Sequence, residues 1–331
     1  MIEDKREPYK LQVAFHPGVF LAERLEELKM SNKEFALRTN KPEKTITAIV
    51  KGESSITPDM AVVFEIVLGI PAYMWLKYQS IYDEFKARDR RKEILRECIP
   101  WMNRFPVTEM IKKGWLPEVK TVEEKTKALL QYFGVASSTA WEAYYLNQKL
   151  KTVFSISLSG IEKLEAISVW LRRGELEASE IRVPEFSALK LKTALSVIKR
   201  SQNASSGDLT GLKGLLYKSG VKIVITSVIN KIPLIGATRW LAGETPLIQL
   251  SDEIKSTEQF QFFLFHQIGH ILLHGKKDVF FEGTGFPGTV HAKEKEADSF
   301  ASKWISTDSL EPKDTMVKSA NKSVGQGFIT P

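Results

Sequence analysis

The stretch FLFHQIGHILLH, residues 263–274, decides how the last third of this 331-residue chain folds. It lies within STEQFQFFLFHQIGHILLHG, residues 256–275, whose apolar spacing predicts one strongly apolar helix. His266 and His270 are four residues apart, so both imidazoles share one face of that helix. Two histidines at this spacing can clamp a single zinc ion.

A zinc site of this kind needs a third protein ligand, and a second predicted helix, HAKEKEADSFASKWI at residues 291–305, can supply it. Glu294 is the expected ligand, with Glu296 as the alternative. Asp298, one turn later, is expected to orient a histidine ring from its far side. The competing interpretation is a buried helix with two hydrogen-bonded histidines and no metal.

The segments before the apolar helix have the composition of β-strands. They are VKIVITSV at residues 221–228, GATRWL at 236–241 and TPLIQLS at 245–251. Strands followed by helices predict a small α+β unit at the C-terminal end of a mainly helical chain.

The first ninety residues contain five short helical patterns. The first follows HPG at residues 16–18, and the others are SNKEFALRT (31–39), PEKTITAIVKG (42–52), ITPDMAVVFEIVLG (56–69) and AYMWLKYQSIYDEF (72–85). Ser31 and Glu34 have the spacing of a capping box. A tight turn, NKP, separates the second and third helices, which together predict a helix-turn-helix.

The third of these helices would enter the major groove of DNA. Its outward residues are expected to be Lys44, Thr45, Thr47, Ala48 and Lys51, which can contact bases or phosphates. Asn32 and Lys33, at the start of the preceding helix, would lie near the DNA backbone. The alternative is a five-helix bundle with a solvated lysine face.

Net charge, cysteine content and the length of apolar runs limit the class of protein further. The formal net charge is +7, but its excess lies in the middle of the chain, so bulk charge alone does not mark a DNA-binding domain. A single cysteine, Cys98, excludes a disulfide framework. The charged N-terminus and the lack of an apolar run of about 18 residues predict a cytoplasmic protein with no membrane partner.

The organisation expected from these patterns has three parts. Residues 1–90 form the helix-turn-helix domain, residues 91–205 a helical middle region, and residues 206–331 the α+β unit. The stretch SQNASSGD, residues 201–208, has the composition of a linker.

The N-terminal seventy residues resemble the HigA-type antitoxins of the Xre helix-turn-helix family. The matching stretches are HPG, GESSITPDMA at residues 52–61 and WLKYQSIYD at residues 75–83. The resemblance implies a homodimer that binds its own operator, often beside a small RNA-cleaving toxin. Glu43 departs from the family pattern, in which a basic or polar residue often stands early in this helix. Phosphates would repel its carboxylate unless it accepts a hydrogen bond from a cytosine amino group.

From about residue 100 to 310 the chain resembles the ImmA/IrrE family of zinc metallopeptidases. The likeness lies in FPVTEMIKKGWL at residues 105–116 and EKEADSFASKWI at residues 294–305. It also includes the strand segments GATRWL and TPLIQLS and the helix that carries the two histidines. The resemblance implies a zincin-like fold that cleaves a regulatory protein. The family's helix reads H-E-x-x-H, and here Gln267 occupies the position of the general base.

Gln267 has nearly the shape of glutamate, but its amide cannot accept a proton and return it at neutral pH. We therefore expect a chain that binds zinc and hydrolyses little or nothing. Such a shape-preserving exchange fits an inactivated peptidase or a natural pseudoenzyme. The alternative function is a non-catalytic sensor or toxin-binding module.

Overall fold

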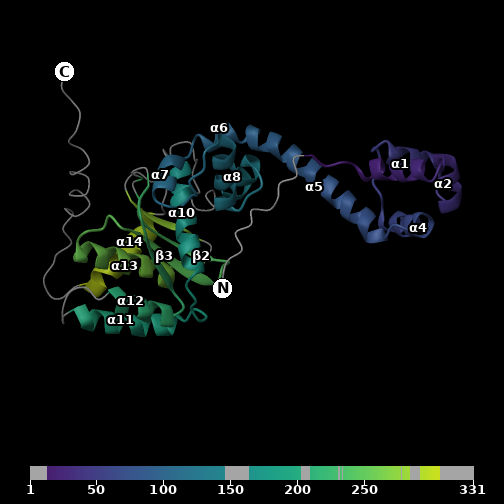
Figure 1. The fold of residues 1–331 in the computed structure, drawn as a ribbon. Helices are drawn as coiled ribbons and strands as arrows, with labels where there is room; N and C mark the ends of the chain where they lie inside the picture. The colour runs from purple at the N-terminus through teal and green to yellow at the C-terminus, as the bar shows by residue number, and fades with distance from the viewer. Residues whose placement is uncertain are drawn as a thin grey trace, which may run out of the picture. The chain divides into compact units, whose positions relative to one another are not determined.

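A computed structural model describes residues 13–145, 164–202, 209–229, 232, 234–276, 278–283 and 291–305. The chain divides into two compact units, Met1–Glu97 and Cys98–Pro331, and each is described here by itself. The predicted fold class is confirmed, since the chain is mostly helical with one small sheet in its C-terminal part (Figure 1). No described helix is both long and apolar enough to cross a membrane.

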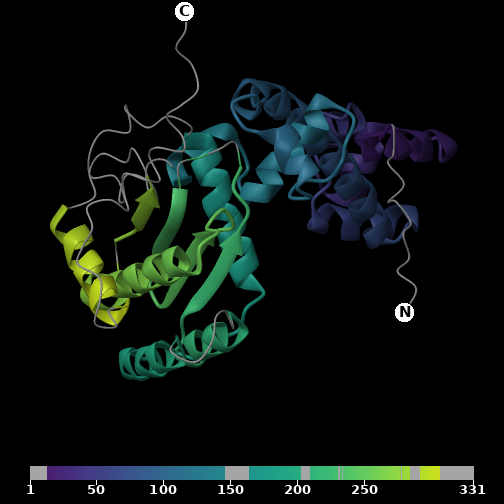
Figure 2. The same ribbon diagram turned by 90° about the vertical axis from the view of Figure 1, so that its left-hand side faces the viewer.

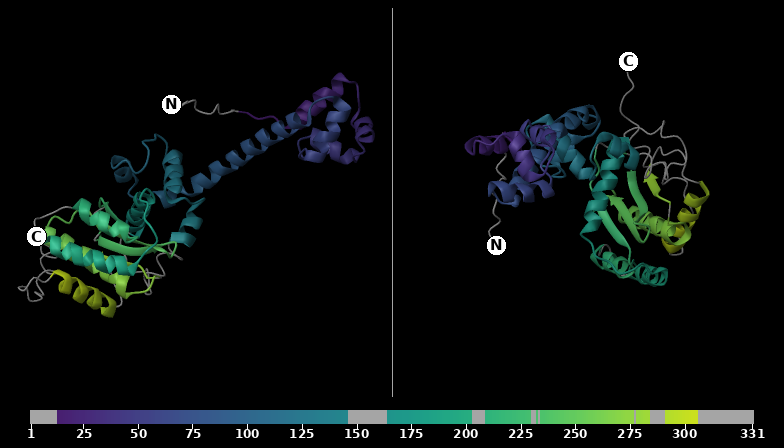
Figure 3. Two further views of the ribbon diagram at one scale, coloured as in Figure 1. Left: turned by 90° about the horizontal axis from the view of Figure 1, so that it is seen from below. Right: turned by 90° about the vertical axis from the view of Figure 1, so that its right-hand side faces the viewer.

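The first unit contains five helices within residues 13–97, as predicted. They are α1 (Pro17–Glu27), α2 (Asn32–Thr39), α3 (Glu43–Val50), α4 (Pro58–Leu68) and α5 (Ala72–Glu97). The last of them is longer than the sequence pattern indicated, because the charged segment after residue 85 continues the same helix for 26 residues in all. Figure 3 shows α5 extending beyond the bundle formed by α1–α4.

The start of α2 differs in one detail from the predicted capping box. The Ser31 hydroxyl accepts from the Glu34 backbone N–H at 3.1 Å, as a cap should. The Glu34 carboxylate, however, accepts from Arg38 Nη2 at 2.6 Å, which is its neighbour one turn later on the helix. The reciprocal half of the capping box is therefore replaced by an ion pair.

A buried aromatic and aliphatic core fixes the angle between α2 and α3. Phe35, Ile46, Ile49 and Phe64 are fully buried in this core. The turn between the two helices passes through Asn40, whose φ of 48° is the left-handed conformation that asparagine tolerates. Because one face of α3 is anchored in this way, its other face is left to solvent.

The second unit begins with short helices and continues into longer ones. These are α6 (Ile99–Met102), α7 (Val107–Lys112), α8 (Val122–Phe133), α9 (Ser138–Trp141), α10 (Leu164–Ser179), α11 (Ala188–Gln202), α12 (Leu209–Lys218), α13 (Thr257–Leu273) and α14 (His291–Ile305). The sequence pattern missed the two four-residue helices. The boundary expected at residues 205 and 206 lies outside the described residues.

Four strands form the sheet of this unit in the order β1-β3-β2-β4. They are β1 (Lys222–Thr226), β2 (Leu234–Leu241), β3 (Thr245–Ser251) and β4 (Phe280–Gly283). The pair β1 and β3 is parallel, and the other pairs are antiparallel. The first three strands were predicted, whereas the edge strand β4 was not.

Helices cover both faces of the sheet. On one face lies α10 (Figure 2). Its Ala178 packs against Val224 and Leu247. On the other, Phe265 and Ile268 of α13 join the main apolar core. The alternation of residues along β1 and β3 thus sends successive side chains to two different helical layers.

The candidate site lies where α13 and α14 approach each other closely. A side chain on Gly269 would lie 3.3 Å from the Ala297 Cα, which is tighter than ordinary contact. Glycine therefore lets the two helices pack backbone to backbone at this point. Glu294, one turn before Ala297, is thereby brought next to the histidine face of α13.

Candidate metal centre and DNA-binding helix

Three side chains from two helices converge on one point. His266 Nε2 lies 2.9 Å from His270 Nε2, and Glu294 Oε2 lies 3.2 and 3.4 Å from these two nitrogens. Both histidines are buried, with 1% of each residue exposed. Among the described residues, these three form the group whose ligand atoms all lie within 4.8 Å of one another.

The donor set and its spacing fit a zinc ion. Ligands about 2.1 Å from one tetrahedral ion lie roughly 3.4 Å from each other, close to the three distances above. Two imidazole nitrogens and a carboxylate are also the donors found in catalytic zinc sites. The second carboxylate oxygen of Glu294 is buried and has no hydrogen-bond partner among the described residues.

Each histidine has a further partner on its other ring nitrogen. His266 Nδ1 lies 2.9 Å from Asp298 Oδ1, so the orienting role expected for Asp298 has the required geometry. His270 Nδ1 lies 3.0 Å from His274 Nδ1, a contact the sequence pattern did not suggest. Phe280 stacks on the His270 ring with centroids 3.8 Å apart and planes at 14°.

The two histidines of the site have pKa values shifted in opposite directions. Burial lowers the pKa of His266, but hydrogen bonds with Asp298 and Glu294 outweigh it and raise the pKa to about 9. Burial dominates at His270 and lowers its pKa to about 4. At Glu294, burial acts to raise the pKa, and the two histidines overcome it and lower the pKa to about 2. A metal ion at neutral pH would therefore displace a proton from His266.

Sequence reasoning missed one carboxylate beside this site, that of Glu282. Its Oε2 lies 3.2 Å from His266 Nε2. Burial, the main cause, raises the pKa of Glu282 to about 7, against the opposing effect of His266. Glu282 lies on β4, a strand of four residues that is too short to give a reliable alternating pattern.

Gln267 is fully buried next to the first histidine. Neither its amide nitrogen nor its amide oxygen has a hydrogen-bond partner among the described residues. The amide nitrogen lies near Gly236 on β2, which pairs in register with Glu282 on β4. Burying an amide without a hydrogen-bond partner is costly, so this is an unfavourable environment for a glutamine among the described residues.

In the first unit, α3 presents the face expected to contact DNA. Lys44 and Lys51 are exposed and Thr45, Thr47 and Ala48 are half-buried, while Ile46 and Ile49 face the core. At the start of α2, Lys33 is exposed and Asn32 is half-buried. The DNA-contacting roles of these residues remain a prediction.

Comparison with known proteins supports both parts. Residues 21–74 match the helix-turn-helix family, and residues 220–306 match the family described as the IrrE N-terminal-like domain. The uncharacterized HTH-type transcriptional regulator YddM of Escherichia coli is 32% identical over 79 residues, which are 23% of this chain and 84% of that protein.

Two solved structures resemble the N-terminal part. An addiction module antidote protein of the HigA family from Coxiella burnetii is 34% identical, covering 25% of this chain and 91% of its own, with a TM-score of 0.24. The antitoxin HigA of Pseudomonas aeruginosa, solved with the higBA promoter, is 27% identical, covering 24% and 89%, with a TM-score of 0.24.

The fold and the site together define a helix-turn-helix protein that carries a peptidase-like domain with a histidine and carboxylate centre. The chain belongs to the Xre-type helix-turn-helix transcriptional regulators, with HigA antitoxins among its structural neighbours, and its C-terminal part is an IrrE/ImmA-like peptidase domain. Both resemblances seen in the sequence are confirmed.

Proposed function

We propose that this protein is a dimeric repressor of its own operator whose peptidase-like domain holds zinc but is catalytically silent. The observation that carries the proposal is the group formed by His266, His270 and Glu294, beside which Gln267 stands in place of the base. The exposed Lys44 and Lys51 on α3 support the DNA-binding part.

Zinc is the expected metal because the donors are two imidazoles and one carboxylate at tetrahedral spacing. A bound zinc ion would act as a Lewis acid on a peptide carbonyl. Within the protein, the side chain at position 267 would carry the proton during the reaction. Gln267 can hydrogen-bond a peptide there but cannot carry the proton, so binding without cleavage follows.

The active form of such a domain would cleave a regulatory protein. With Gln267 in place, the same site favours a second candidate function, a sensor or toxin-holding module. The Gln267 amide, which is buried and has no partner among the described residues, supports that function, because an amide has both a donor and an acceptor for a peptide that reaches the site. The Gln267→Glu variant described in the Discussion separates the two.

Replacing Lys44 with Ala is expected to weaken binding to the operator. If Lys44 contacts a base, the substitution should weaken the binding free energy more on the operator than on random duplex, by about 1–3 kcal/mol. If it touches only phosphate, the loss should be uniform and the salt slope should fall by about one. Fluorescence anisotropy of the full-length protein on its own upstream region measures both.

Lys86→Ala is the matched control for this experiment, because Lys86 is also an exposed lysine and lies on α5. It should leave operator binding unchanged. Equal binding by the Lys44 variant and the unaltered protein across salt concentrations would exclude α3 as the contact helix.

The homodimer is expected to form through the exposed apolar face of α4. Val62 and Ile66 lie one turn apart and are 54% and 78% exposed. Replacing Ile66 with Glu places a charge in that face and should convert the dimer to a monomer, as measured by sedimentation. Operator affinity should fall with it, because two half-sites are then no longer bound together.

Leu37→Glu makes the same chemical change on α2, at a residue that is 76% exposed. This control should keep the dimer. A protein that stays dimeric with Glu at position 66 uses a different face.

A further inference from the structure

A chain of hydrogen bonds runs from the metal centre to the protein surface. It begins at His270 Nδ1, which lies 3.0 Å from His274 Nδ1. It continues from His274 Nε2 to Glu296 Oε2 over 3.2 Å. The His274 side chain is only 3% exposed, whereas that of Glu296 is 62% exposed. The His274 imidazole thus connects the buried His270 to the exposed carboxylate of Glu296.

Only one arrangement of protons satisfies every contact in this chain when both rings are neutral. Two Nδ1 atoms at 3.0 Å need one proton between them. The carboxylate of Glu296 can only accept, so His274 Nε2 must donate to it. His274 Nδ1 is then an acceptor, and the proton between the rings belongs to His270 Nδ1.

The opposite arrangement creates a conflict at the outer end. If His274 Nδ1 carried the proton, its Nε2 lone pair would face the Glu296 oxygen at 3.2 Å. His270 would then carry its own proton on Nε2, directed at His266 and Glu294. That tautomer has no lone pair to offer a metal at the point where the three ligands converge.

We propose that His274 and Glu296 are positioning residues that hold His270 in the tautomer that presents Nε2 to the metal. This inference rests on the proposed zinc centre. It gives His270 the same kind of support that Asp298 gives His266, with an imidazole inserted between the ligand and the carboxylate. Partners of this kind typically contribute about 10–100-fold to metal affinity.

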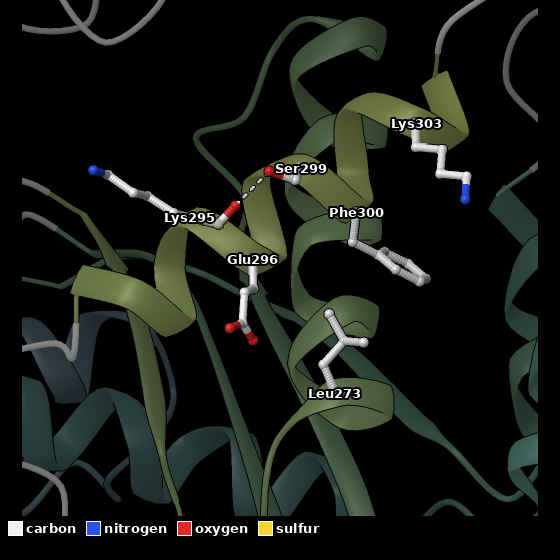
Figure 4. Close-up of a pocket in the computed structure, with 6 residues that line it drawn as sticks. All are labelled: Leu273, Lys295, Glu296, Ser299, Phe300 and Lys303. Carbon is white, nitrogen blue, oxygen red and sulfur yellow. Dashed lines mark hydrogen bonds between the residues drawn. The ribbon is translucent and has the colours of Figure 1, made fainter.

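The outer end of this chain is accessible without disturbing the core. Glu296 lines an open pocket of about 450 Å³, whose apolar side includes Leu273 and Phe300 (Figure 4). A substitution at Glu296 therefore tests the chain where packing is loose. Water can partly replace an exposed carboxylate, so its removal should cost less than removal of the His274 imidazole.

The test measures zinc affinity by competition with a chromophoric chelator and reads the His270 tautomer from its ¹⁵N chemical shifts in metal-free protein. His274→Phe keeps an aromatic ring beside Phe280, which lies 5.1 Å from the His274 ring, but removes the acceptor. It should weaken zinc binding about 10–100-fold and move the His270 proton toward Nε2. Glu296→Ala should show smaller changes in the same direction.

Two further variants separate positioning from general packing. His274→Asn keeps an acceptor near the Nδ1 position and should restore most of the affinity. Glu244→Ala removes an exposed carboxylate from the turn after β2 and should change nothing. Unchanged zinc affinity in a folded His274→Phe protein would overturn the proposal, and so would a His270 proton on Nε2 in the unaltered protein. If the unaltered protein binds no zinc, the proposed function fails, and the tautomer measurement still decides the role of His274.

Discussion

Peptide hydrolysis should rise about 10²–10⁴-fold when Gln267 is replaced by Glu, which is the usual contribution of a general base. The two side chains have nearly the same volume, so the buried position next to His266 should accept the change. The new carboxylate can take a proton from the attacking water and pass it to the leaving amine. A bound zinc ion would offset the cost of burying this extra negative charge.

The experiment incubates the unaltered protein and the variant with zinc, the products of neighbouring genes and a cell extract, and identifies fragments by mass spectrometry. Fragments produced only by Gln267→Glu, and abolished by a chelator or by adding His270→Ala, would support an inactivated peptidase. Identical fragments in every condition would favour the binding-module function. Glu282→Gln is the control, because the Glu282 carboxylate lies 3.2 Å from His266 Nε2 and is not an expected ligand, so this variant should produce no new fragments.

The sequence predicted which side chains of the candidate site share a helix face, because helices convert spacing into position. His266 and His270 are four residues apart, as are Glu294 and Asp298. The two side chains of each pair therefore lie on the same face of their helix. The structure brings three of these side chains together and places the fourth behind a histidine ring. Their roles as ligands remain a prediction.

What the sequence could not predict depends on contacts between segments. Glu282 reaches His266 only because β4 pairs with β2, and a four-residue strand has too little alternation to be recognised. The role of His274 was hidden for a related reason. Its spacing from His270 is that of a metal ligand, and only the position of Glu296 on the facing helix shows which ring nitrogen must donate.

In the helix-turn-helix unit, too, local sequence signals predicted some features and missed others. The boundary between α2 and α3 followed from the Ser31 cap and the NKP turn, and the structure adds a Thr57 cap on α4 and a left-handed Asn40 in that turn. The length of α5 did not follow from the sequence, since a charged segment has no apolar face to indicate whether a helix ends or continues.

Removal of His270 should abolish stoichiometric zinc binding. Its loss takes away one of three protein donors and should cost more than the roughly 10–100-fold typical of an outer partner. Elemental analysis of protein purified without chelator should find about one zinc per chain before the change and almost none after it. His270→Gln, which keeps more of the buried volume beside Phe280 than Ala does, guards against simple misfolding.

Thermal unfolding supplies an independent readout, because a ligand that binds only the folded state stabilises it. Zinc at a hundred times its dissociation constant should add about 2.7 kcal/mol to the unaltered protein and nothing to the His270 variants. His16→Asn removes the imidazole that caps α1 in the first unit while keeping a side chain able to cap, so it should retain the metal. Zinc retained by the His270 variants would show that His266 and Glu294 do not share a metal with this residue, and zinc lost from the His16 variant would place the metal in the first unit.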